Sequence, residues 1–380
     1  MKRFHPSWVA AAAAALLVAC SGGGAGDQSV RVAYGKLVTF GDSLSDVGSY
    51  NVAPGIVAAM GGGRYTVNTG DAVNWTELLA STAGVDALCP AQTGLNTVQE
   101  LVGFPPVPEV NHAGCYSYAQ GGARVTDPVG PGNVALLALG DPSGALGQLT
   151  KPIVEQIARH LATTANGTFE AGDLVTVMAG GNDAIMQDAT FKGMLAGGLD
   201  VATATAAVNA SMQAAGTELA GYIKDQIVAK GAQRVVVVNL PDLSSTPRYL
   251  GADADTGTET DDHVTRALIQ GLVTKFNDAL AEGLTGTEDH VLLVDAYTVS
   301  RDQGAHPTQY GLTNVTNYAC DVGENGVLKG LPTSLVCSTD TLVTGAGETW
   351  FYADEVHPTP YGYKLLAQLV TTEMAKKGWL

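Results

Sequence analysis

Ser43 lies in the stretch KLVTFGDSLSD, directly after an apolar run at residues 37–40 that predicts a buried strand. A serine hydroxyl is a weak nucleophile, and it reacts only when a base takes its proton and an acid orients that base. Serine is also a common residue at the start of a helix, where its hydroxyl accepts a backbone N–H. Ser43 is therefore a candidate nucleophile whose partners must be sought elsewhere in the chain.

A candidate base and acid occur near the other end of the chain, in FYADEVHPTPYGY, where His357 follows Asp354 by three residues. This spacing allows one short turn to hold carboxylate and imidazole together. A similar stretch, GAHPTQYG, contains His306, with Asp302 four residues before it. A base must be placed by geometry before anything else. We favour His357 because a helical pattern follows it, whereas none follows His306.

Two glycine-rich stretches could supply hydrogen-bond donors to an oxyanion, which acyl transfer requires. Gly180-Gly181-Asn182-Asp183 follows a predicted strand at 173–178, so the Asn182 amide would project from a strand end. In SYAQGGARV, the pair Gly121-Gly122 would let a backbone N–H approach a substrate with no Cβ in the way. Asn182 could instead cap a helix, and each of these residues has such a structural alternative when taken alone.

Taken together, the four blocks resemble those of the GDSL, or SGNH, family of lipases and esterases. They are Gly-Asp-Ser-Leu at 41–44, Gly-Gly at 121–122, Gly-Gly-Asn-Asp at 180–183 and Asp-x-x-His-Pro at 354–358. They occur in the family's order and extend over residues 36–363, nearly the whole chain. The G-x-S-x-G elbow of α/β-hydrolases is absent, because Ser43 lies in Gly-Asp-Ser-Leu-Ser.

The resemblance implies hydrolysis of carboxylic esters with Ser43 as nucleophile, His357 as general base and then acid, and Asp354 as the orienting carboxylate. It implies an oxyanion hole made by the backbone N–H groups of Ser43 and Gly122 and by the Asn182 side chain.

One residue of the second block departs from the family pattern. The family usually has Asn five residues before its glycine, and this chain has Ser117. Gly121 therefore stays open as the alternative to Gly122.

The resemblance leaves the substrate open. The stretch QYGLTNVTNYAC at 309–320 is similar to segments of family members that act as lipases and phospholipases, some of which also transfer acyl groups to alcohols. Alternatives are a carbohydrate or aryl esterase with the same site, or a surface lipoprotein that keeps the fold without turnover. No metal or organic cofactor is implied.

Strands and helices must alternate to position these blocks. The patterns predict strands at 37–40, 173–178, 234–239 and 290–295, and helices at 74–83, 148–163, 201–230, 260–283 and 358–377. Such alternation predicts a doubly wound α/β fold with ligands at the carboxyl ends of the strands. The family resemblance specifies a flavodoxin-like α/β/α sandwich with a mostly parallel sheet.

Two segments, 84–135 and 298–350, break this alternation and are expected to be loop insertions that frame the site. Each contains one cysteine pair, and of three possible pairings we favour Cys89–Cys115 and Cys320–Cys337. We expect an apolar wall of the site to come from the first insertion; the candidate residues are Leu95, Val98, Leu101, Val102 and Phe104.

The N-terminal residues predict export. Lys2 and Arg3 precede an apolar run at 8–19 that ends in Leu-Val-Ala-Cys, which resembles a bacterial lipobox with Cys20 as the lipidated residue. We expect a signal peptide at 1–19, a tether at 20–34 and a single domain at 35–380. Ser21 fits an outer-membrane lipoprotein, anchored to the membrane by Cys20; an ordinary signal peptide and secretion is the alternative.

Composition excludes one class of partner. The 380 residues carry a formal charge of −17 and show no basic stripe, so nucleic acid is not an expected partner. The expected partner is an ester, either a lipid or a small molecule.

Overall fold

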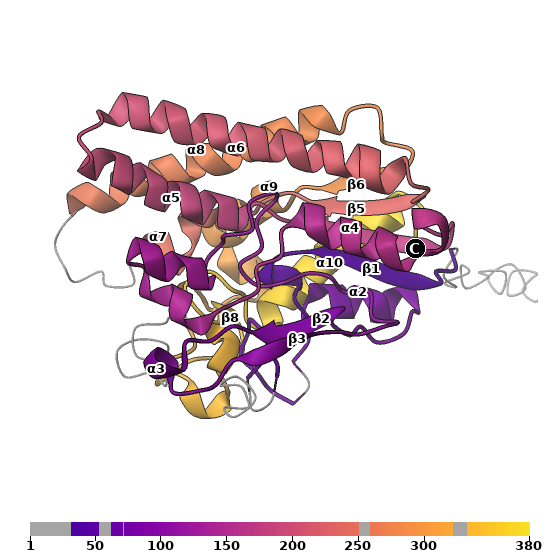
Figure 1. Cartoon of the computed structure of the whole chain (residues 1–380), viewed down its shortest axis with the longest axis horizontal. Helices are drawn as coiled ribbons and strands as arrows, with labels where there is room; N and C mark the ends of the chain where they lie inside the picture. The colour runs from indigo at the N-terminus through magenta and orange to yellow at the C-terminus, as the bar shows by residue number, and fades with distance from the viewer. Residues whose placement is uncertain (1–31, 53–61, 71, 251–258, 322–332) are drawn as a thin grey trace, which may run out of the picture.

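A computed structural model describes residues 32–52, 62–70, 72–250, 259–321 and 333–380. The signal peptide and Cys20 lie outside these residues. At the centre is a parallel four-stranded sheet in the order β1-β4-β5-β6 (Figure 1). Its strands are β1 (Lys36–Gly41), β4 (Asp173–Met178), β5 (Arg234–Val238) and β6 (Val291–Val294). The predicted α/β class with a parallel sheet is confirmed.

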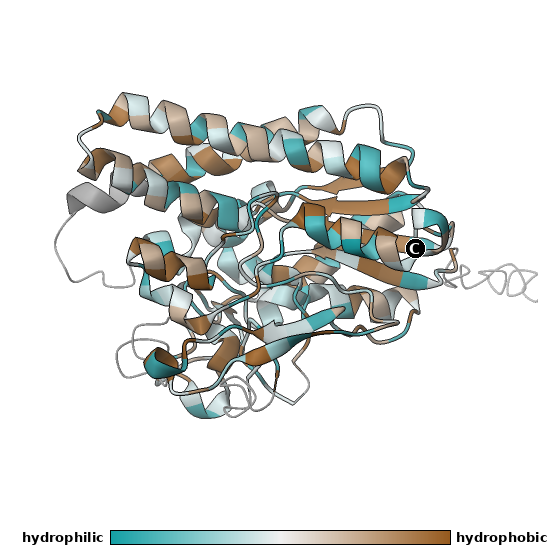
Figure 2. Ribbon diagram, in the orientation of Figure 1, coloured by the Kyte–Doolittle hydropathy of each residue, from teal (hydrophilic) through white to brown (hydrophobic). Residues whose placement is uncertain are grey.

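Helices cover both faces of the sheet, and alternate strand residues face each layer (Figure 1). One layer holds α4 (Ile153–Thr163), α5 (Gly181–Ala196), α6 (Val201–Tyr222) and α8 (Glu259–Gly283). The other holds α2 (Trp75–Ala83) and α10 (Pro360–Lys376). Because both faces are buried, the strands are mostly apolar along their length (Figure 2). The arrangement is an α/β/α sandwich.

The helix boundaries follow from local chemistry. Asn74 caps α2 in a capping box with Glu77. Helix α4 begins at Ile153 rather than at residue 148 because Pro152 precedes it. The expected helix at 201–230 is α6 followed by a π-helical turn, Ile223–Val228. Thr359 caps α10, which starts with Pro360 at its first position.

The two insertions contain more regular structure than expected. The first holds the antiparallel strands β2 (Gln92–Leu95) and β3 (Val107–Asn111) and the short helix α3 (Gln99–Val102). Helix α7 (Pro247–Leu250) follows β5, and α9 (Ala296–Ala305) follows β6 and runs into the second insertion. The parallel pair β7 (Asn314–Tyr318) and β8 (Trp350–Tyr352) completes that insertion. Both predicted disulfides, Cys89–Cys115 and Cys320–Cys337, are present.

Candidate active site

Ser43 and His357 meet at the carboxyl end of β1. Strand β1 ends at Gly41, and Ser43 begins a short 3₁₀ turn whose N-cap is Asp42, with its side chain accepting a bond from the Leu44 N–H at 3.0 Å. The His357 Nε2 atom lies 2.7 Å from the Ser43 Oγ atom. The fold therefore brings two side chains that lie 314 residues apart in the sequence to hydrogen-bonding distance.

Asp354 is held on the other side of the imidazole. His357 Nδ1 lies 2.8 Å from both carboxylate oxygens of Asp354. The backbone N–H groups of Val356 and His357 donate to Oδ1, and that of Ser334 donates to Oδ2. Burial opposes the negative charge, but the His357 charge and these hydrogen bonds outweigh it and lower the pKa of Asp354 to about 2. An ionised Asp354 keeps the Nδ1 proton in place, so Nε2 faces Ser43 as the acceptor.

The glycine pair is brought to Ser43 by the edge of the sheet. Residues 116–120 run beside β1: Thr39 N–H donates to Tyr116 O, and the N–H groups of Tyr118 and Gln120 donate to Thr39 O and Gly41 O. The Gln156 side chain, from α4, bonds both the N–H and the C=O of Gly41 at 2.9 and 2.8 Å. The carboxyl end of β1 is thus fixed from two sides.

The two glycines differ in the state of their N–H groups. Gly121 N–H donates a hydrogen bond to Asp46 Oδ2 at 2.9 Å, so it is not available to an oxyanion. Gly122 N–H donates no hydrogen bond to another described residue, and Gly122 lines the cleft that Ser43 also lines. Gly122 has φ +76°, and a Cβ there would lie 2.3 Å from Pro131 O, so only glycine fits.

Asn182 lies in the first turn of α5, beside the same cleft. Its Nδ2 donates one hydrogen to Ala123 O at 2.8 Å, and an amide NH₂ has a second hydrogen to offer. The bond to Ala123 also ties the amide to the loop that carries Gly122. The next residue, Asp183, accepts hydrogen bonds from Arg124 Nε and Val125 N–H, which fix the position of the same loop.

Asp46 and Tyr65 belong to the site although sequence reasoning did not single them out. Asp46 Oδ1 accepts the Gly48 and Ser49 N–H groups at 2.8 and 2.7 Å, while Oδ2 accepts Gly121 N–H. The Tyr65 ring lies 4.6 Å from the His357 ring, centroid to centroid. Asp46 is visible in sequence only as a neighbour of the first block, and nothing in the sequence around Tyr65 indicates its contact.

The expected apolar wall is in a different place. The cleft above Ser43 is lined by Leu136, Leu139, Leu146, Ile185 and Met186. None of the five candidates at 95–104 lines it. They were wrong because Leu95 is fully buried in an apolar cluster with Tyr50 and Tyr65, against which Val102 and Phe104 pack, while Leu101 is exposed.

His306 forms an acid–histidine pair of its own, with Nδ1 2.8 Å from Asp302 Oδ1. Both side chains are about half exposed, at 55% and 45%. No serine hydroxyl of the described residues hydrogen-bonds to His306. The pair therefore lacks a nucleophile, whereas His357 has one.

A sequence model of the GDSL-like lipase/acylhydrolase family matches residues 37–370. An uncharacterised protein of the trpE-trpG intergenic region of Pseudomonas putida is 26% identical over 344 residues. The match covers 88% of this chain and 47% of that protein. The chain thus spans about half the length of this curated relative.

Two solved structures are similar at low sequence identity. An extracellular lipase from Streptomyces rimosus is 15% identical, with a TM-score of 0.39 and coverage of 89% of this chain and 99% of that one. A phospholipase A1 from Streptomyces albidoflavus is 14% identical, with a TM-score of 0.40 and coverage of 90% and 100%. Because the family match extends over residues 37–370, this chain belongs to the GDSL-like lipase/acylhydrolase family.

Proposed function

We propose that the protein is a serine ester hydrolase that works through an acyl-enzyme, with Ser43, His357 and Asp354 as its triad. Family membership supports the general activity, hydrolysis of esters. The observation that carries the proposal is the continuous chain of contacts from Ser43 Oγ to His357 Nε2 and from His357 Nδ1 to Asp354. A binding protein without turnover has no need of this arrangement.

In the first step Ser43 Oγ attacks the ester carbonyl carbon while its proton passes to His357 Nε2. The carbonyl oxygen becomes an oxyanion that accepts hydrogen bonds from Gly122 N–H, Ser43 N–H and Asn182 Nδ2. The C–O bond to the alcohol then breaks, and His357 gives its proton to the leaving alcohol. A water molecule attacks the acyl-Ser43 carbonyl by the same route, releasing the carboxylic acid and restoring the Ser43 hydroxyl.

Gly122 is the better second donor because Asp46 already holds the Gly121 N–H. Preorganised donors of this kind cost no reorganisation when charge develops, which is why they contribute strongly to catalysis.

Within the described residues, no helix combines the length and apolarity needed to cross a bilayer. We propose separately that the protein is exported and anchored at Cys20, which the N-terminal sequence and the two disulfides support.

The decisive test is Ser43→Ala assayed with nitrophenyl butyrate. We expect hydrolysis to fall to the background rate with unchanged thermal unfolding, because the change removes one hydroxyl and adds no bulk. His306→Ala is the matched control and should keep at least half of the activity, whereas His357→Ala should behave like Ser43→Ala. Activity of Ser43→Ala within tenfold of wild type would refute the triad.

A further inference from the structure

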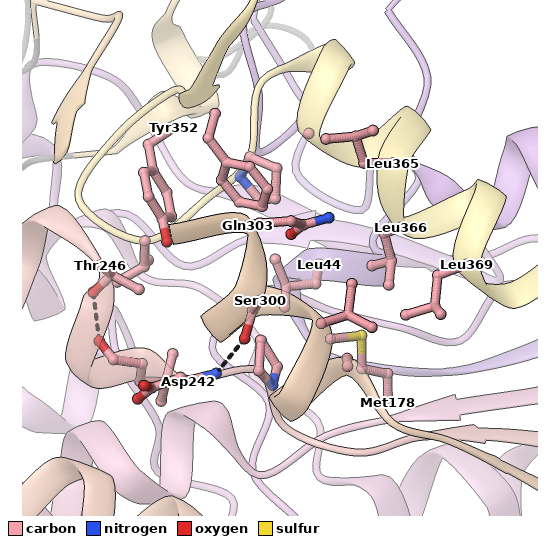
Figure 3. A pocket seen from close by; sticks show the side chains of 18 residues that line it. Leu44, Met178, Asp242, Thr246, Ser300, Gln303, Tyr352, Leu365, Leu366 and Leu369 are labelled. Atoms are coloured by element: carbon pink, nitrogen blue, oxygen red, sulfur yellow. Dashed lines mark hydrogen bonds between the residues drawn. The ribbon is translucent and has the colours of Figure 1, made fainter. Parts of the chain in front are cut away.

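A second pocket lies beside the active-site cleft, between the ends of β4 and β5 and the helices α9 and α10 (Figure 3). Met178, Val299, Leu366 and Leu369 form much of its wall. The pocket contains about 650 Å³ of empty space, its opening included, against about 2030 Å³ for the cleft.

This apolar pocket and the cleft share three wall residues, Leu44, Leu243 and Val356. Leu44 directly follows Ser43, and Val356 directly precedes His357. Leu44 and Val356 are half-buried and Leu243 is buried, so a layer of three apolar side chains separates the two spaces. The pocket therefore begins one residue from each of the two residues proposed to react.

Gln303, on α9, is one of several polar side chains in the wall. It is 7% exposed, and its amide forms no hydrogen bond with another residue that the structure describes. Figure 3 shows its side chain extending toward Leu366, among the apolar side chains. By contrast, Ser300 and Thr246 are both paired, Ser300 with the Asp242 N–H and Thr246 with Leu243 O.

We propose that this pocket binds the acyl chain of the substrate ester and that Gln303 limits the length of that chain. The inference rests on the proposed function. The acyl group stays bonded to Ser43 while the alcohol leaves and water enters. A smaller pocket beside Ser43 suits the part that stays, and the larger open cleft suits the part that departs.

The length limit follows from the cost of burying an unpaired polar group. A chain short enough to leave a water molecule at the Gln303 amide keeps that amide hydrogen-bonded. A longer chain would displace the water and cover the amide with methylenes, leaving a buried donor and acceptor unsatisfied. Up to that length each added methylene gains apolar burial. The preferred substrates are therefore medium-chain acyl esters, with a decline beyond the length at which the chain reaches Gln303.

The test compares kcat/KM for nitrophenyl acetate, octanoate and laurate in variants that fill the pocket from opposite walls. Val299→Phe acts from α9 and Leu366→Phe from α10. Each should lower kcat/KM for octanoate at least tenfold while changing the acetate value less than twofold, which also shows that the site is intact. Gln303→Leu should raise laurate relative to octanoate at least fivefold. Leu199→Phe, at a residue 43% exposed outside both spaces, is the matched control.

The alcohol side is tested with acetate esters of ethanol and octanol. If the pocket variants change the preference among these alcohols instead of among the acyl chains, the acyl assignment is overturned. An unchanged octanoate-to-acetate ratio in Val299→Phe and Leu366→Phe, both folded by thermal unfolding, overturns it as well. A wild-type protein that hydrolyses none of the esters would overturn the proposed function together with this inference.

Discussion

Asp46→Asn tests whether the nucleophile turn positions the oxyanion loop. The Asp46 carboxylate is buried, 2% exposed, and accepts three backbone N–H groups. Two come from Gly48 and Ser49, close to Ser43 in sequence, and the third comes from Gly121. An asparagine of the same shape has one oxygen to accept with and an NH₂ group that repels a facing N–H. With the oxygen kept on the Gly48 and Ser49 groups, the NH₂ faces Gly121.

The magnitude follows from what the Gly121 N–H loses. A buried donor left unsatisfied costs about 1–3 kcal/mol, which is enough to displace the loop that carries Gly122. If Gly122 N–H then misses the oxyanion altogether, kcat falls by about 10²–10³, the effect of losing one donor. We expect a fall of roughly 10- to 300-fold in kcat, because the loop keeps its bonds to β1 through residues 116–120. The change in KM should be smaller, since the donor acts mainly when charge develops.

The assay combines steady-state kinetics on nitrophenyl butyrate with the rate of labelling by a nitrophenyl alkylphosphonate. The phosphonate forms a tetrahedral adduct with an oxyanion, so its labelling rate should fall in parallel with kcat. Asp173→Asn is the matched control: Asp173 is also buried, accepts Glu170 N–H at 2.9 Å and begins β4 at the opposite end of the sheet. It should lower the thermal unfolding temperature without lowering kcat.

One result would refute this reasoning. If Asp46→Asn lowers stability about as much as Asp173→Asn but keeps kcat and phosphonate labelling within threefold of wild type, Asp46 only stabilises the fold. The oxyanion loop would then be positioned by its bonds to β1 and by Asp183 alone.

Asn182→Ala should lower kcat about 10²–10³-fold with a smaller change in KM, measured from initial rates, and an effect on KM alone would make Asn182 a binding residue. Asp354→Asn should cost about 2 kcal/mol of stability at pH 7, because the pKa of Asp354 is lowered from 3.8 to about 2 in the fold. That cost should vanish as pH falls from about 4 toward 2, which urea unfolding at several pH values measures; a cost that does not depend on pH would mean lost packing rather than lost charge. Cys20→Ser should move the protein from the membrane pellet to the soluble fraction, and unchanged pelleting would contradict the lipobox.

The sequence predicts those parts of the fold whose burial is uniform or whose ends are marked. Strand β4 occupies 173–178, as predicted, because every one of its residues is buried and the run has no competing pattern. Helix α2 is likewise predicted, since Asn74 and Glu77 mark its start. Helix α5 was not predicted: it begins with Gly181-Asn182-Asp183, and its apolar residues do not recur with a helical period.

The candidate site was predictable to the extent that its residues lie in short motifs. Ser43 and Asn182 follow β1 and β4, whose carboxyl ends the parallel sheet brings to one edge, whereas Asp354 and His357 lie in a turn after β8. Asp46 and Tyr65 depend on contacts with Gly121 and His357, which only the folded chain brings near them. The apolar walls of the cleft are harder to predict. The sequence pattern around a leucine such as Leu95 does not distinguish a residue that lines a cleft from one that packs in a core.

Two buried carboxylates lie close to the proposed reacting pair, and the fold gives them opposite tendencies to ionise. Asp354 receives three backbone N–H groups and the imidazole, which outweigh burial. For Asp42, burial is the largest influence; the bond from Leu44 N–H and the charge of His357 oppose it only in part, and its pKa rises to about 7. Environments that push two neighbouring acids apart distinguish their roles. We therefore propose that Asp354 is the anion that orients His357 and that Asp42 is a capping residue held partly protonated at neutral pH.

Asp42→Asn tests this assignment, because the amide oxygen can still accept the Leu44 N–H while the titration is lost. A carboxyl with a raised pKa in the fold gives stability that is present below its unfolded pKa of 3.8 and is lost as pH rises through about 7. Wild type should therefore lose stability relative to Asp42→Asn between about pH 4 and pH 8, by at most about 4 kcal/mol for a shift of this size. Urea unfolding of both proteins at pH 5 and pH 8 measures the difference. If the stability of wild type relative to Asp42→Asn stays constant, or increases, from pH 5 to pH 8, Asp42 is ionised in the fold and its role must be reconsidered.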